Sequence, residues 1–391
     1  MPDTDTTTVE ETIVSSERRD TPGTRVAFFL QNLRYGGAQR VTINIANGLT
    51  ARGYDVDLVV ANLEGDFTSD VSDELNVVEL AVPSVAGLGV LAGIPRLKAY
   101  LESTHPAVLI AGQTHANIAA ALAARAAKPR PYVALTEHSA YGRSEGVKDW
   151  LTNALASYVY TLADDIVGVS EGVVESIVEN TRITPTNTSV LYNPIDLETV
   201  RARSKDPVTH DWLTDPSIRP VVSVSRLETQ KNLSLLLRAF ETVHERYPDT
   251  RLIVVGKGSE RDRLDELSRS LGIDDVVAFP GYVDNPYAYM RQSAVFVLSS
   301  HYEGLPTVLI EALACGCSIV STDCPYGPRE ILVDGEFGRL TPVDDEAALA
   351  EAIGATLDNP VDPDRSIERS EHFSMANGID RYEEYILANA G

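Results

Sequence analysis

Two glutamates, Glu303 and Glu311, are the side chains whose type and spacing first suggest chemistry in this sequence. They lie eight residues apart, and a helical rise over that stretch would separate them by about 12 Å. Two carboxylates that act on one glycosidic bond lie about 5–9.5 Å apart. The pair therefore suits the two ends of an elongated ligand with phosphates between them, such as a nucleotide sugar. The alternative interpretation is that both glutamates are surface charges of a helix.

The residues around this pair predict a strand, a turn and the start of a helix. Residues 294–298 are an apolar run typical of a buried strand. Gly304 then allows the backbone to turn, and Pro306 suits a first helical turn, where its missing N–H costs nothing. Leu309 and Leu313 continue at helical spacing. Free backbone N–H groups at such a helix N-terminus attract phosphate.

Another predicted strand-to-helix loop carries two cations, Arg226 and Lys231. It follows an apolar run at residues 220–225 and precedes a helical pattern at residues 233–240. In an open α/β sheet the ligand crevice lies at the carboxyl ends of the strands, which is where this loop is expected. The fork-shaped guanidinium of an arginine and the point charge of a lysine together suit a pyrophosphate.

The first half of the chain shows the same alternation of strand, loop and helix. Residues 25–30 predict a buried strand, and Gly36 and Gly37 follow it. Residues 41–49 have a helical pattern, and 56–60 predict the next strand. The two glycines would let a phosphate or a sugar approach the backbone closely. They are equally typical of a plain turn, and the fuller dinucleotide fingerprint G-x-G-x-x-G is absent here.

His138 is the histidine that the sequence places best for chemistry. It follows a predicted strand at residues 132–135, at the sheet edge where ligands bind. A hydrogen-bonded structural role is the alternative for a single histidine of this kind. A glycine-containing stretch at residues 140–146 comes next and could close over an acceptor.

Length and composition indicate a large globular protein of two or three domains, because the chain has 391 residues and 43% hydrophobic content. No apolar run reaches the roughly 18–20 residues that span a bilayer. Residues 1–24 are polar and lack an apolar signal core, so we expect a disordered lead and a cytoplasmic chain. The cysteines, Cys315, Cys317 and Cys324, lack a fourth ligand for zinc and are expected to be small buried residues in a reducing compartment. No bound metal is expected.

The net charge of −24 would repel nucleic acid, so that class of partner is not expected. Repulsion of this size is tolerated when salt screens it, because the Debye length falls to about 3 Å at 1 M. The composition therefore suggests a salt-loving cytoplasm, and a merely acidic mesophilic protein is the alternative.

Residues 84–150 carry a net positive charge, unlike the chain as a whole, and they include an apolar run at 85–94. Seven basic residues outnumber four acidic ones there, namely Arg96, Lys98, Arg125, Lys128, Arg130, Arg143 and Lys148 against Glu102, Glu137, Glu145 and Asp149. Apolar and basic character together suggest a face that touches anionic lipid on the cytoplasmic side without spanning it. The alternative is an ordinary core helix around residues 118–127 with a scattered surface.

Taken together, these stretches resemble the retaining glycosyltransferases of family 4, the glycosyl transferases group 1, over about residues 25–390. The resemblance is carried by Glu303-x7-Glu311, by Arg226-Leu227-x3-Lys231 and by Gly36-Gly37, in order and each in a strand-loop-helix context. It implies the GT-B fold, which is α/β with two Rossmann-like β/α/β domains facing a central cleft.

The same resemblance implies a division of the chain into an N-terminal acceptor domain and a C-terminal donor domain. The acceptor domain would comprise residues 25–200, with a C-terminal helix at 375–391 packing back on it. Residues 201–374 would form the nucleotide-sugar donor domain.

Roles for individual residues also follow from the resemblance. Arg226 and Lys231 would bind the donor diphosphate, Glu303 would hold hydroxyls of the transferred sugar, and Glu311 would hold the ribose. His138 would lie at the reacting sugar. The remaining expected contacts are backbone or base contacts with the donor, at Gly36, Gly37, Tyr282, Val283, Gly304, Leu305 and Thr307.

Residues 323–332 resemble a subgroup that builds lipid-linked oligosaccharides and surface polysaccharides. Tyr326-Gly327-Pro328 replaces the short Gly-x-Pro-Glu loop of many relatives, which leaves Arg329 and Glu330 without an assigned role.

The expected function is transfer of a hexose from a nucleoside diphosphate sugar, such as a UDP-sugar, to a glycan or lipid-linked acceptor, with retention of the α configuration. The nucleotide sugar is a substrate, and neither a cofactor nor a metal is expected. Two alternatives share the architecture: a sugar-nucleotide epimerase or phosphorylase, and a non-catalytic sugar-nucleotide binding subunit.

Overall fold

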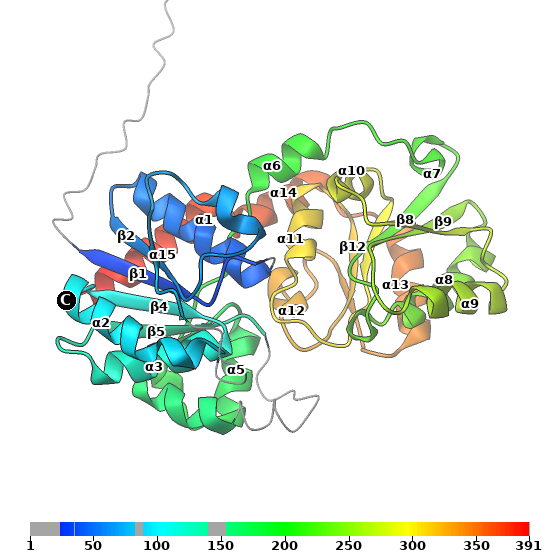
Figure 1. Cartoon of the computed structure of the whole chain (residues 1–391). Coiled ribbons are helices and arrows are strands. Elements are labelled where there is room, and N and C mark those ends of the chain that lie inside the picture. Colours follow the sequence, from blue (N-terminus) through cyan, green and yellow to red (C-terminus); the bar gives the residue numbers. More distant parts are fainter. Residues whose placement is uncertain (1–23, 35, 83–88, 140–153, 391) are drawn as a thin grey trace, which may run out of the picture.

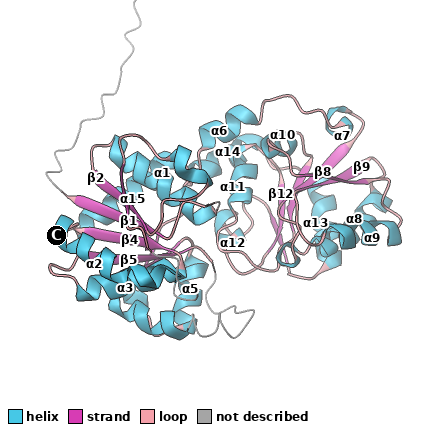
Figure 2. Ribbon diagram, in the orientation of Figure 1, coloured by secondary structure: helices cyan, strands magenta, loops and turns pink. Residues whose placement is uncertain are grey.

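The computed structural model describes residues 24–34, 36–82, 89–139 and 154–390. These residues form two parallel β-sheets that lie side by side, each covered by helices on both faces (Figure 1, Figure 2). The predicted α/β class with two Rossmann-like domains is confirmed. The expected loop at 140–146 and the polar lead, apart from Thr24, lie outside the described residues.

The N-terminal sheet has seven strands in the order β3-β2-β1-β4-β5-β6-β7. The strands are β1 (Arg25–Leu30), β2 (Asp55–Val60), β3 (Asn76–Glu79), β4 (Val108–Gly112), β5 (Tyr132–Glu137), β6 (Asp165–Gly168) and β7 (Thr188–Val190). Its principal helices are α1 (Gly37–Ala51), α2 (Ile94–Thr104), α3 (Thr114–Ala126) and α5 (Glu171–Asn180).

The C-terminal sheet has six strands in the order β10-β9-β8-β11-β12-β13. The strands are β8 (Arg219–Val224), β9 (Thr250–Val255), β10 (Val277–Gly281), β11 (Val295–Leu298), β12 (Ile319–Thr322) and β13 (Arg339–Thr341). Its helices are α8 (Leu233–Arg246), α9 (Arg261–Ser270), α10 (Pro286–Arg291), α11 (Thr307–Ala314), α12 (Pro328–Ile331) and α13 (Glu346–Asp358). Helices α6 (Leu197–Arg203), α7 (Asp211–Thr214), α14 (Pro363–Glu371) and α15 (Met375–Asn389) complete the chain.

The buried strand runs explain why the sheets form where the sequence predicts them. β1 covers residues 25–30 and is buried from its second residue onward, as expected for a parallel strand covered on both faces. It pairs in parallel with β2 on one side and β4 on the other. The predicted strands at 132–135 and 220–225 are likewise present as β5 and β8, with ends shifted by one or two residues.

Helix α15 returns from the C-terminal half to the N-terminal sheet and lies beside α1 (Figure 1). Tyr382 and Ile386 of α15 belong to the same buried cluster as β1 and β2. The Arg52 guanidinium donates to a carboxylate oxygen of Glu383 over 2.5 Å, and the Tyr54 hydroxyl donates to the other over 2.9 Å. The last helix is therefore held by both apolar packing and ion pairing.

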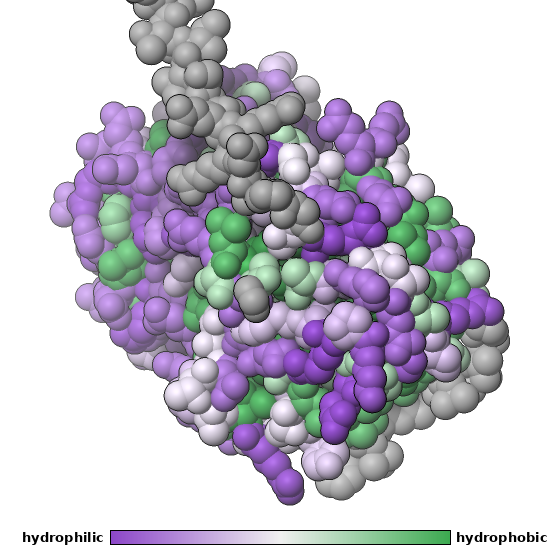
Figure 3. All heavy atoms as spheres, turned by 90° about the vertical axis from the view of Figure 1, so that its left-hand side faces the viewer, coloured by the Kyte–Doolittle hydropathy of each residue, from purple (hydrophilic) through white to green (hydrophobic). Residues whose placement is uncertain are grey.

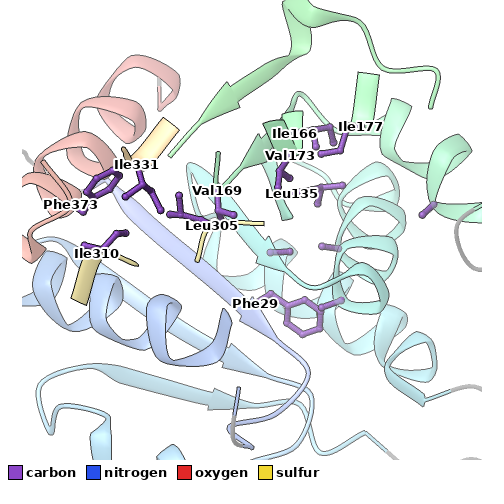
Figure 4. Packing of buried hydrophobic residues seen from close by; sticks show 14 of the residues in the cluster. Phe29, Leu135, Ile166, Val169, Val173, Ile177, Leu305, Ile310, Ile331 and Phe373 are labelled. Carbon is purple, nitrogen blue, oxygen red and sulfur yellow. The ribbon is translucent and has the colours of Figure 1, made fainter. Parts of the chain in front are cut away.

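An apolar cluster also joins the two halves. Val169, just after β6, lies next to Leu305 and Ile331 of the C-terminal half in Figure 4. All three side chains are at most 7% exposed. The contact between the halves therefore buries apolar side chains, which makes separation of the halves unfavourable.

Across the described ranges, no helix combines the length and the apolar character that crossing a membrane requires. All three cysteines are buried free thiols, as predicted, and burial raises their pKa values.

Candidate active site

An ion pair between Lys231 and Glu303 lies at the carboxyl edge of the C-terminal sheet. Lys231 ends a short 3-10 turn after β8, and Glu303 follows β11, the parallel neighbour of β8. The Lys231 Nζ atom lies 2.5 Å from Glu303 Oε1, and the two side chains are only 13% and 8% exposed. The Ser300 hydroxyl donates to the same oxygen over 2.6 Å. A buried carboxylate with these two donors is held in one orientation.

The backbone around this pair is joined by hydrogen bonds between the two loops. The Ser299 hydroxyl donates to the Lys231 carbonyl over 2.8 Å. The Gln230 side-chain amide donates to the Tyr302 carbonyl over 2.8 Å, and the His301 N–H donates to the Gln230 carbonyl over 2.9 Å. The two loops therefore form one unit, and the lysine and the glutamate are positioned together.

Arg226 lies at the start of the same loop as Lys231, but its side chain is exposed. Within the described part of the chain, its guanidinium makes no hydrogen bond or ion pair. The loop lies so close to the one after β9 that a Cβ on Gly256 would lie 1.8 Å from the Ser225 carbonyl oxygen, and one on Gly258 would lie 2.2 Å from that of Leu227. The two glycines thus allow the loop after β9 to pack directly against the backbone on either side of Arg226.

The turn after Glu303 leads into an uncapped helix N-terminus. Helix α11 begins at Thr307, and its N-cap Pro306 offers no side-chain acceptor to the first N–H groups. Leu305 is 7% exposed and belongs to the apolar cluster, so only its backbone can serve a ligand. Because Glu303 precedes the helix, the helical separation of about 12 Å expected for the two glutamates has no basis. The alternative of two helix-surface charges fails for Glu303 for the same reason.

Glu311 lies on α11 and has a partly buried side chain. Among the described residues, its carboxylate has no hydrogen-bond partner. Burial raises the pKa of Glu311 to about 7, although the positive charge of Arg40 on α1 acts in the opposite direction. A buried carboxylate without a hydrogen-bond partner is stabilised by a ligand whose hydroxyl groups donate to it.

His138 follows β5 in the N-terminal half and faces the turn at Gly304. A Cβ on Gly304 would lie 2.5 Å from the His138 carbonyl oxygen. The ring Nε2 lies 3.4 Å from the Thr136 hydroxyl, and the buried Nδ1 has no partner among the described residues. Burial lowers the pKa of His138 to about 4, so the ring is neutral at pH 7.

The glycines of the N-terminal loop lie at the start of α1. Helix α1 begins at Gly37 and has no side-chain cap. A Cβ on Gly37 would have no neighbour within 4 Å, whereas one on Gly36 would lie 2.3 Å from the Gln39 side-chain oxygen. The first turn of α1 therefore offers free N–H groups next to open space, as an anion site requires.

Tyr282 and Val283 follow β10, the edge strand of the C-terminal sheet. The Tyr282 ring is 62% exposed and has the Lys257 ammonium 5.5 Å from its centre, whereas Val283 packs partly against the core. In the strand order β10-β9-β8-β11, the expected base, diphosphate and sugar contacts come in that order along one sheet edge. This is the order of the same groups in a nucleotide sugar.

Sequence reasoning missed three side chains at this site: Ser300, Gln230 and Arg40. Ser300 follows a strand and is three residues before Glu303, so its position at a strand end was an available signal. Gln230 and Arg40 carried no local signal. Ser170 is the N-cap of α5, because its Oγ accepts from the Val173 N–H over 3.2 Å. It also donates to the Gly304 carbonyl over 2.9 Å, a contact that links the two halves.

Two family models match the chain, one on each half. The Glycosyltransferase Family 4 model matches residues 35–199, and the Glycosyl transferases group 1 model matches residues 214–373. Together they cover the strands of both sheets except β1, which precedes the first matched residue. The chain belongs to the family 4, group 1 glycosyltransferases, which have the GT-B fold.

Individual relatives agree with this assignment. A Campylobacter jejuni N-acetylgalactosamine-N,N'-diacetylbacillosaminyl-diphospho-undecaprenol 4-alpha-N-acetylgalactosaminyltransferase is 37% identical over 52% of this chain, but the match spans only 54% of that enzyme. An uncharacterized glycosyltransferase of Haemophilus influenzae is 26% identical over 91% of this chain and 97% of its own. The crystal structure of Anabaena HepE in complex with UDP superposes with a TM-score of 0.77 at 18% identity, covering 93% of this chain and all of that one.

Proposed function

We propose that this protein transfers a hexose, with retention of configuration, from a nucleoside diphosphate sugar to a lipid-linked or polysaccharide glycan. The observation that carries the proposal is the buried Lys231–Glu303 ion pair beside the uncapped N-terminus of α11. It provides a cation and free N–H groups for a diphosphate, next to a fixed carboxylate for sugar hydroxyls. The turn that carries Glu303 contacts His138 of the other domain, where an acceptor would enter.

In the proposed reaction the bond between the anomeric carbon and the diphosphate oxygen breaks. Negative charge then grows on the leaving diphosphate, and Lys231, Arg226 and the first N–H groups of α11 stabilise it. Preorganised donors of this kind are usually the largest catalytic contribution. The acceptor hydroxyl attacks the same face of the sugar, and its proton passes to the leaving phosphate. The product therefore keeps the α configuration.

Glu303 and His138 would act on the transferred sugar and Glu311 on the ribose. Glu303 is an oriented carboxylate that accepts from sugar hydroxyls, and the neutral His138 ring can exchange a hydrogen bond with one. The first turn of α1, at Gly36 and Gly37, would approach the donor from the other side of the cleft, and Tyr282 and Val283 would lie at the base.

The relatives support the proposed substrates. The Campylobacter enzyme acts, by its name, on a diphospho-undecaprenol-linked glycan, and the Anabaena structure holds UDP. We therefore propose a UDP-sugar as donor and a lipid-linked glycan as acceptor. We also propose that transfer needs no divalent cation, since Arg226 and Lys231 can neutralise the diphosphate, so turnover should persist in excess EDTA.

A donor screen tests the proposal. Thermal shifts with UDP-, GDP- and ADP-sugars in high salt should single out one base, and transfer to a diphospho-undecaprenol-linked glycan should then give an α-linked product by NMR. A β-linked product would contradict retention. Product that forms without an acceptor, or only with inorganic phosphate, would indicate an epimerase or a phosphorylase instead.

We further propose peripheral contact with anionic membrane through residues 84–150, although several of the cations there already have partners. Arg96 donates to the Leu80 carbonyl over 2.7 Å, Lys98 pairs with Glu102 and Arg130 pairs with Asp164. Helix α3 in the same region is a largely buried core helix. On the face of the N-terminal domain that Figure 3 shows, apolar residues occur as small groups among hydrophilic ones. Flotation with anionic and neutral liposomes would decide whether this contact exists.

The net charge of −24 supports a further proposal, adaptation to high salt. On this hypothesis the melting temperature rises between 0.1 M and 3 M KCl. An unchanged melting temperature would contradict it.

A further inference from the structure

The first turn of α5 in the N-terminal domain is held by two segments of the C-terminal domain. Ser170, its N-cap, donates to the Gly304 carbonyl over 2.9 Å. The Glu171 N–H donates to the carboxylate oxygens of Glu330 over 2.9 Å and 3.2 Å. A Cβ on Gly172 would lie 2.3 Å from the Tyr326 ring, so that ring rests directly on the turn. One helix start therefore touches both the Gly304 turn and the segment of Glu330.

Glu330 lies on α12 and binds the N-terminal domain through two groups. Besides the Glu171 N–H, it accepts a hydrogen bond of 2.6 Å from the Tyr192 hydroxyl, just after β7. A carboxylate at a helix N-terminus is favoured by the helix dipole as well as by the hydrogen bond itself. In the described part of the chain, every hydrogen bond to the Glu330 carboxylate comes from the other domain.

Arg329 beside it behaves differently. Its guanidinium pairs with Asp323 and with Asp334, the latter over 3.0 Å, and both partners belong to its own domain. Arg329 and Glu330 are adjacent on α12, but they act differently. Glu330 contacts the other domain, whereas Arg329 pairs within its own domain.

We propose that Glu330 is a positioning residue that fixes how the two domains meet. By capping α5 and binding Tyr192, it holds the Glu303–Gly304 turn against His138, and so sets the separation of the donor-side carboxylate from the acceptor side. The effect on transfer rests on the proposed function, whereas the effect on domain placement does not.

The rate test compares Glu330→Ala and Glu330→Gln with Arg329→Ala as the matched control. Loss of a charge-assisted contact at this point should lower the kcat of transfer about tenfold in Glu330→Ala. Glu330→Gln keeps a carbonyl acceptor and should lose less. UDP affinity, measured by calorimetry, should stay within about twofold of the parent in all three variants, because Glu330 does not contact the donor site. A kcat unchanged in Glu330→Ala, or a parallel loss of UDP affinity, would overturn the proposal.

Tyr192→Phe gives a second measurement that does not depend on the alanine variant folding. If Tyr192 and Glu330 act as one contact, the double variant Tyr192→Phe/Glu330→Gln should lose less than the product of the two single losses. Independent effects of the two substitutions would contradict a shared contact.

Domain placement can be measured even if no transfer is detected. Spin labels at the exposed positions Ser69→Cys and Ser270→Cys report the distance between the domains, since the native cysteines are buried. The distance distribution should broaden or shift in Glu330→Ala and Glu330→Gln and should match the parent in Arg329→Ala. An unchanged distribution in both Glu330 variants would overturn the proposal, whereas absent transfer with a shifted distribution would overturn only the proposed function.

Discussion

Gly304 and His138 touch across the domain interface through their backbones. A Cβ on Gly304 would lie 2.5 Å from the His138 carbonyl oxygen and 3.2 Å from the Ser139 Cα. The turn that carries Glu303 is therefore pressed against the end of β5, which carries His138. Any side chain at position 304 must separate the donor and acceptor sides of the proposed site.

The first prediction concerns that contact. Gly304→Ala should lower the kcat of transfer by about 100-fold, because displacement of reacting groups by roughly 1 Å has effects of this size. Gly354→Ala, in α13, is the matched glycine control: its Cβ would meet only the end of the Tyr247 side chain, at 3.0 Å, and transfer should persist. A Gly304→Ala enzyme with the parent rate would show that the domains need not meet this closely.

The second prediction concerns the central ion pair. Lys231→Ala should reduce kcat/KM at least about 100-fold, the scale of losing one preorganised donor to a developing negative charge. It also leaves Glu303 buried without its cation. Steady-state kinetics would measure the loss, with the exposed Lys205→Ala as the control. Near-normal turnover in Lys231→Ala would count against the site.

The third prediction is a pH dependence of donor binding through Glu311. Burial raises its pKa to about 7, and ribose hydroxyls that donate to the carboxylate would favour the charged form. Binding should therefore release a proton near pH 7, and UDP affinity should fall up to about tenfold per pH unit below that value. Calorimetry between pH 5.5 and 8.5 would measure this dependence.

Glu311→Gln is the control for this measurement, because it cannot titrate. UDP itself takes up protons in the same range, so the difference between the parent and Glu311→Gln isolates the contribution of the carboxylate. Parallel pH profiles for the two proteins would contradict a ribose contact.

The fourth prediction concerns Glu137, which is buried just before His138. Its carboxylate accepts from the Tyr160 hydroxyl and from the Asn117 amide over 3.1 Å, yet burial raises its pKa to about 7. A folded-state pKa above the unfolded value of 4.5 favours folding at low pH, and this contribution is lost as pH rises through 7. Above pH 7 the buried charge should cost on the order of 3 kcal/mol.

Glu137→Gln should therefore raise the free energy of unfolding at pH 8.5 and have little effect at pH 5. Denaturant unfolding at the two pH values would measure the difference, with the exposed Glu74→Gln as the control. An equal effect of Glu137→Gln at both pH values would show that this carboxylate does not titrate in the range.

Local patterns in the sequence were sufficient to predict several strands of this fold. The apolar runs at 25–30 and 220–225 became β1 and β8 with bounds that agree to within one residue, because a parallel strand buried on both faces needs continuous apolar character. The loops after these strands could be predicted to carry polar side chains that bind ligands, since these loops lie at the carboxyl edge of the sheet. The Ser170 cap of α5 is also a local contact, because an N-cap contacts the turn that follows it.

The contacts that shape the site were decided only by the tertiary structure. Lys231 and Glu303 are 72 residues apart, and Glu171 and Glu330 are 159 apart. Helical spacing could not give the separation of Glu303 and Glu311, because the helix begins only after Glu303. Sequence alone placed the ends of strands such as β5 and β8 to within one or two residues. Which of those ends meet across the sheets depends on strand order and domain packing, since contacts between distant residues form only when the whole chain has folded.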